Sequence, residues 1–158
     1  MATEKPNDVQ PASILGGKAV IAFVGDVSIL LTNSPMWTPV DIKGVLEETI
    51  RLGGLRSNVR AFTHHFGEIF GADATQRKQL VEWQAAHKVP PVERVINISD
   101  SAVMRAAMTA YSWMTKTNAK AFKSTEIDTA CRWLTEGCDT SPEKVHAMVL
   151  ACYKLMGK

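Results

Sequence analysis

The stretch VINISDSAVMRAAMTA, residues 95–110, decides the fold. Its apolar run ends at Asp100-Ser101, and a helical pattern begins directly afterwards. Asp and Ser are favoured at helix N-termini, because their side-chain oxygens accept hydrogen bonds from backbone N–H groups that lack a partner within the helix. The stretch therefore predicts a strand over Val92–Ser99 that turns at Asp100-Ser101 into a helix over Ser101–Thr115.

Strand-like and helix-like segments alternate along the rest of the chain. Thr38-Pro39-Val40-Asp41, for example, has the residues of a helix start, and Gly53-Gly54 those of a helix end. The other expected strands are Lys18–Val24, Asp26–Thr32, Val59–Phe66 and Ala119–Lys123, and the other expected helices are Thr75–Lys88, Thr125–Glu136 and one that begins at Ser141. This order predicts an α/β fold: a single, mostly parallel sheet of four to five strands flanked by helices.

The ends of the chain are expected to differ from its middle. Residues 1–17 are polar and contain prolines, so the composition predicts a flexible N-terminal tail. Residues 18–158 are expected to form a single domain, in which residues 136–158 are a C-terminal helical extension.

Three segments carry a resemblance to a known family. They are INISDSAVMRAAMTAYSW (96–113), KAFKSTEIDTACRWL (120–134) and, less specifically, ATQRKQL (74–80). In their order and spacing they resemble the SpoIIAA-like branch of the STAS superfamily, the sulfate transporter and anti-sigma factor antagonist domains, over about residues 18–136. The resemblance implies a bacterial, cytoplasmic, non-enzymatic regulatory module that works by docking on a protein partner.

In anti-sigma factor antagonists a Ser at this strand-to-helix junction is phosphorylated, and the resemblance puts Ser101 at that place. The surface of Asp100, Ser101, Ala102 and Arg105 is accordingly a candidate phospho-switch or partner surface. The family motif continues with Ser/Thr and Gly, whereas Ala102 and Val103 follow here. We therefore interpret Ser101 first as a helix cap, and phosphorylation is the alternative.

Other chemistry has little support in the sequence. His64 and His65 are adjacent in a predicted strand and should point to opposite faces, so we expect no metal site there. The chain lacks phosphate-loop, dinucleotide and nucleophile-elbow motifs, so we expect no cofactor and no catalytic residue. With 18 basic and 16 acidic residues we expect no nucleic-acid partner, and no apolar run is long enough for a transmembrane helix. The three cysteines, in no framework spacing, fit a cytoplasmic location.

Large apolar residues supply a second candidate surface. Trp37 follows Pro35-Met36 in a predicted loop, and Met104, Met108 and Trp113 crowd one predicted helix, where they could line a ligand pocket or a contact surface. Two alternatives to a partner-docking module stay open. One is a small-molecule or lipid-binding carrier with a pocket between the sheet and the Met-rich helices. The other is a self-assembling structural module, for example a homodimer, in which an edge strand or the C-terminal helix pairs with another copy.

Overall fold

The computed structural model describes residues 7–33, 38–56, 59–66, 74–115 and 118–158. The strands are β1 (Val9–Ile14), β2 (Ala19–Val24), β3 (Val27–Thr32), β4 (Arg60–His65), β5 (Arg94–Ile98) and β6 (Ala119–Phe122). The α-helices are α1 (Pro39–Gly53), α2 (Ala74–Ala86), α3 (Ala102–Thr115), α4 (Ile127–Thr135) and α5 (Pro142–Met156), with 3-10 turns at Leu15–Gly17 and Ser124–Glu126.

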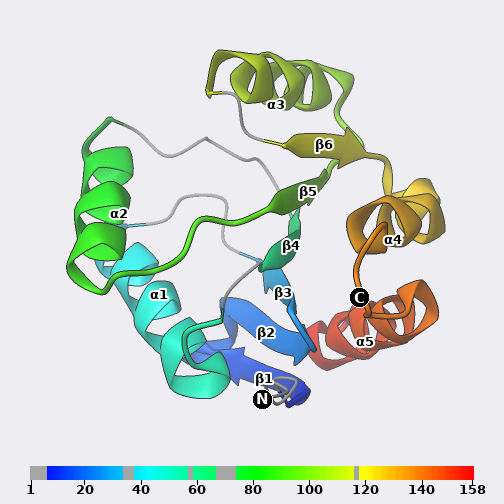
Figure 1. The fold of residues 1–158 in the computed structure, drawn as a ribbon, viewed down its shortest axis with the longest axis horizontal. Coiled ribbons are helices and arrows are strands. Elements are labelled where there is room, and N and C mark those ends of the chain that lie inside the picture. Colours follow the sequence, from blue (N-terminus) through cyan, green and yellow to red (C-terminus); the bar gives the residue numbers. More distant parts are fainter. Residues whose placement is uncertain (1–6, 34–37, 57–58, 67–73, 116–117) are drawn as a thin grey trace.

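The six strands form one sheet in the order of the sequence. β1, β2 and β3 pair antiparallel, and β3 to β6 pair parallel. Figure 1 shows α1 and α2 on one side of this sheet and α4 and α5 on the other, with α3 beside β6 at the end of the sheet away from β1. The predicted α/β fold, with a mostly parallel sheet flanked by helices, is confirmed, and the sheet has six strands instead of four to five.

The additional strand is β1, so the expected flexible tail over residues 1–17 is wrong where the structure describes it. β1 pairs with β2, and the register shifts between Val9 and Ala12, which lets the edge strand accommodate Pro11. The chain before β1 is also held, because the Asp8 carboxylate accepts a hydrogen bond of 2.9 Å from the Gly25 N–H. Residues 1–6 lie outside the described part of the chain.

Helix starts were predictable from local residues. Thr38 Oγ1 accepts a hydrogen bond from the Asp41 N–H, and the Asp41 carboxylate accepts one from the Thr38 N–H, both at 3.2 Å. At α5, Ser141 Oγ accepts a hydrogen bond of 3.3 Å from the Lys144 N–H. These contacts satisfy N–H groups that the first turn of a helix leaves without a partner.

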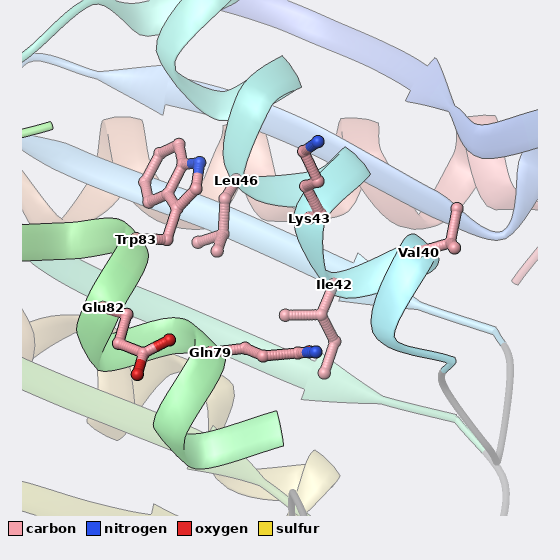
Figure 2. A pocket seen from close by; sticks show the side chains of 7 residues that line it. All are labelled: Val40, Ile42, Lys43, Leu46, Gln79, Glu82 and Trp83. Carbon is pink, nitrogen blue, oxygen red and sulfur yellow. The ribbon is translucent and has the colours of Figure 1, made fainter. Parts of the chain in front are cut away.

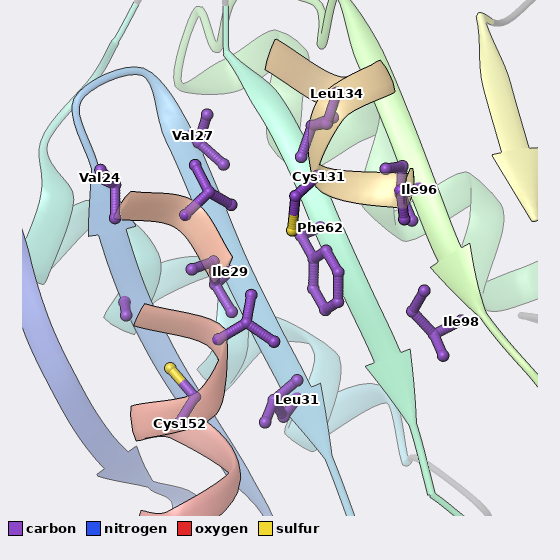
Figure 3. Packing of buried hydrophobic residues seen from close by; sticks show 14 of the residues in the cluster. Val24, Val27, Ile29, Leu31, Phe62, Ile96, Ile98, Cys131, Leu134 and Cys152 are labelled. Carbon is purple, nitrogen blue, oxygen red and sulfur yellow. The ribbon is translucent and has the colours of Figure 1, made fainter. Parts of the chain in front are cut away.

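The larger hydrophobic core lies between the sheet and helices α4 and α5. Figure 3 shows the side chains of Phe62 and Ile96 on the strands facing the helices that carry Cys131 and Cys152. Burial raises the pKa of both thiols to about 12, so both stay protonated at neutral pH. A smaller cluster on the other side of the sheet packs β1 and β2 against α1.

Helix α5, expected as a C-terminal extension, is an integral part of the larger core. It packs against β1, β2, β3 and α4. The side chains on one face of α5 are fully buried, namely those of Val145, Val149 and Cys152. The helix covers the sheet face next to α4 and contributes three fully buried residues to the larger core.

Candidate functional site

The turn between β5 and α3 brings two of the predicted site residues together. Ser101 Oγ accepts a hydrogen bond of 3.3 Å from the Met104 N–H, which is the bond an N-cap residue makes. The Asp100 carboxylate accepts hydrogen bonds from the Ser124 N–H at 2.9 Å and from the Ser124 hydroxyl at 2.7 Å. These bonds hold the pKa of Asp100 below its ordinary value. Ser101 thus caps α3, while Asp100 ties the turn to the end of β6.

The remaining members of this surface have different positions. Ala102 is exposed next to Asp100 and Ser101, and Arg105 is half-buried. The Arg105 guanidinium donates a hydrogen bond of 2.9 Å to the Ser99 carbonyl, so it braces the turn from the first helical turn of α3. The structure therefore groups all four predicted residues, and Asp100, Ser101 and Ala102 form the exposed part. Phosphorylation of Ser101 stays a prediction.

The capping role of Ser101 can be measured on unmodified recombinant protein. Ser101→Ala is expected to lower the free energy of unfolding by about 1 kcal/mol, because the Met104 N–H loses its acceptor. Ser101→Asn, which retains a capping oxygen, is the control. Its free energy of unfolding should fall by only a few tenths of the loss seen in Ser101→Ala. Chemical denaturation gives the difference, and equal losses in the two variants would argue against capping.

Helix α3 presents an apolar face to solvent. Val103, Trp113 and Met114 are 78%, 79% and 83% exposed. Between them, Ala106, Ala107 and Ala110 are exposed as well. At 100° per residue these six positions lie within one third of the helix circumference. We call them the outer face of α3.

The second predicted surface is not brought together. Met104 and Met108 are half-buried on the side of α3 that carries the buried Ser112, and α3 packs there against β6. Trp113 belongs to the outer face, roughly opposite Met104 around the helix. Trp37 lies outside the described residues. The grouping of Met104, Met108 and Trp113 on one surface is therefore wrong, and only Trp113 is available to a partner on the outer face.

A cluster that the sequence reasoning missed lies at the carboxyl ends of the parallel strands. His64 Nδ1 and Tyr153 Oη share a hydrogen bond of 2.7 Å, and the His64 ring stacks on Phe66 with centroids 4.0 Å apart. Lys158 Nζ lies 4.8 Å from the centre of the Phe66 ring. Burial lowers the pKa of His64 to about 4, with a smaller opposing effect of Asp100, and raises the pKa of Tyr153. Both side chains are thus neutral at neutral pH. The sequence did contain one signal for this cluster: Phe62, His64 and Phe66 are spaced two residues apart, as are residues on one face of a strand.

His64 and His65 point to opposite faces of the sheet, as predicted. His64 faces α5 through Tyr153, whereas His65 Nδ1 is hydrogen-bonded to Thr32 Oγ1 of the neighbouring strand. In the described ranges, no three His, Cys, Asp or Glu side chains lie close enough together to hold a metal ion.

A groove of about 490 Å³ lies between α1 and α2, and Figure 2 shows Leu46 of α1 and Trp83 of α2 beside each other in it. Its lining consists of Val40, Ile42, Lys43, Leu46, Gln79, Glu82 and Trp83. The carrier alternative expects a pocket between the sheet and the Met-rich helices. This groove lies elsewhere, and Met104, Met108 and Trp113 do not line it.

Comparison with known proteins adds a likeness in fold. No family model and no curated protein matches the chain. A solved structure from Shewanella loihica PV-4, described as an uncharacterized protein of the DUF3478 family with a SpoIIAA-like fold, aligns with 85% of this chain and 98% of its own. The identity is 14% and the TM-score 0.46.

Among the described helices, none combines the length and apolar character that a membrane span requires.

Proposed function

We propose that this chain is a non-enzymatic interaction module that binds a protein through the outer face of α3 and the adjacent Asp100–Ser101 turn. The observation that carries the proposal is the exposure of Trp113, at 79%, in a helix that also exposes Met114 and Val103. Trp and Met are enriched in the centres of protein interfaces, because they bury a large contact area. Isolated exposed apolar residues need no explanation, but a continuous face of them does.

The polar groups around the outer face support the same proposal. Thr109 is exposed beside it, yet its hydroxyl donates a hydrogen bond of 2.9 Å to the Arg105 carbonyl and so turns inward to the backbone. The charge of Arg105 is held at the Ser99 carbonyl. Apolar groups at the centre and the polar Asp100–Ser101 turn at one end reproduce the arrangement of core and rim found in interfaces.

Trp113→Lys is expected to reduce recovery of the bound protein at least about tenfold, because truncating or charging a central Trp removes most of the affinity of an interface. The measurement is quantitative mass spectrometry of proteins captured by the tagged chain from its native organism. Leu150→Lys is the matched control, since Leu150 is an apolar residue 52% exposed on the surface of α5. Recovery that is equal for Trp113→Lys and wild type would refute the proposal.

A further inference from the structure

The outer face of α3 also indicates what covers it. α3 has 14 residues and contains one charged side chain, Arg105. That side chain is half-buried and bonded to Ser99, so the outer face itself carries no charge. Partners of different sequence are commonly selected by complementary charges. This face offers no charge for such selection, and two identical copies of it can meet without repulsion.

The outer face is also complementary in size to itself. Its C-terminal end carries the bulky Trp113 and Met114, whereas its N-terminal end and middle carry Val103, Ala106 and Ala110. In an antiparallel pair, the bulky end of one helix lies over the small end of the other. A two-fold axis close to residue 108 would place Trp113 against Val103 and Ala110 against Ala106, twice over. Small residues near such an axis let the two helix backbones approach closely, and antiparallel helices also oppose their dipoles favourably.

The position of α3 permits this pairing. Figure 1 shows α3 at the outer end of the molecule, beside β6 and away from β1 and α5. We infer that the protein partner of the proposed function is a second copy of this chain, bound through an antiparallel, two-fold symmetric α3–α3 contact. This inference rests on the proposed function and names its partner.

The size of the contact sets the expected strength. Fourteen residues make a helix roughly 21 Å long. A single helix pair of that length stays below the roughly 1,200 Å² of buried surface that separates weak from standard complexes. The dimer is therefore expected to form in the micromolar range and to dissociate on dilution.

Sedimentation equilibrium of the purified chain, over a hundredfold range of concentration, tests the inference. Wild type should approach twice the mass of one chain at the highest concentration. Ala106→Glu should weaken the association at least about tenfold, because each copy then places an unpaired carboxylate in the contact. Ala151→Glu makes the same change at an exposed position of α5 and should leave the association unchanged. Circular dichroism checks that each variant is folded.

A double variant reports the direction of the pair. In an antiparallel pair, Ala106→Glu combined with Ala110→Lys places each new carboxylate opposite an ammonium group, so the association should return. In a parallel pair the like charges would meet, and the association would stay lost. A wild-type chain that stays monomeric throughout, an association insensitive to Ala106→Glu, or a double variant that stays monomeric would each overturn the inference. If the chain is monomeric but captures another protein through Trp113, the proposed function stands and only the inference fails.

Discussion

Phe62→Ala is expected to lower the free energy of unfolding by about 3–5 kcal/mol, a large part of the stability of a domain of this size. Phe62 is completely buried in β4, near the middle of the sheet, and its ring lies in the larger core beneath α4 and α5. Removing the ring loses the stabilisation that comes from burying it and leaves a cavity between the sheet and the helices. The cavity can close only partly, because both layers are held in place by their other contacts. Urea denaturation followed by circular dichroism measures the change.

Two companion variants separate the cavity from the loss of an aromatic ring in general. Phe62→Leu keeps most of the volume and should cost well under half as much. Phe122→Ala makes the same chemical change in β6 at the edge of the sheet, where the ring is only partly buried, and should also cost less. A cost for Phe62→Ala no larger than that of Phe122→Ala would mean that the central core is not the main source of stability.

The fold could be predicted because its decisive signals are local. Thr38 with Asp41, and Ser101 with Met104, form their capping contacts within four residues of chain, so short segments contain the information. The buried stripe of Val145, Val149 and Cys152 follows from helical spacing in the same way.

Strand β1 could not be predicted by such reasoning, since distant partners hold it in place. Pro11 and the polar residues around it have the composition of a tail. The strand is stable because β2 pairs with it and because Arg56, 49 residues away, donates a hydrogen bond to the Asn7 carbonyl. The amino-acid composition of the N-terminal segment gives no information about these contacts.

The candidate site was predicted in part for a related reason. Apolar residues surround α3, so periodicity does not tell which side faces β6. The structure settles that Met104 and Met108 face inward and that Trp113 faces outward. The His64–Tyr153 pair was missed because 89 residues separate its members, and only the packing of α5 over the end of β4 brings them together.

That pair is expected to make the stability of the protein depend on pH in the acidic range. Between pH 6.5 and about 4, the unfolded chain protonates His64 while the folded chain does not, because the folded pKa is lowered to about 4. The unfolded state therefore binds more protons in this window, and the stability falls as the pH falls. The loss from this group amounts to at most about 3 kcal/mol and is complete near pH 4.

The charged neighbours of His64 set the size of this effect. Burial is the main cause of the lowered pKa, His65 and Lys158 add to it, and Asp100 opposes it. Protonation also has to accommodate Tyr153, whose hydroxyl shares a hydrogen bond with the ring. Asp100→Asn should consequently steepen the loss of stability on acidification, since it removes a carboxylate that favours the protonated ring.

His64→Gln provides the direct measurement, because an amide can still hydrogen-bond Tyr153 but does not titrate in this range. Wild type should lose roughly 2–3 kcal/mol more than His64→Gln between pH 7 and pH 4, as determined by urea denaturation at each pH. His87→Gln, in the exposed turn directly after α2, is the control for loss of a histidine as such. If His64→Gln and His87→Gln show the same acid profile, then the acid sensitivity arises from the carboxylates that the fold stabilises, and the buried His64–Tyr153 pair has no special part in it.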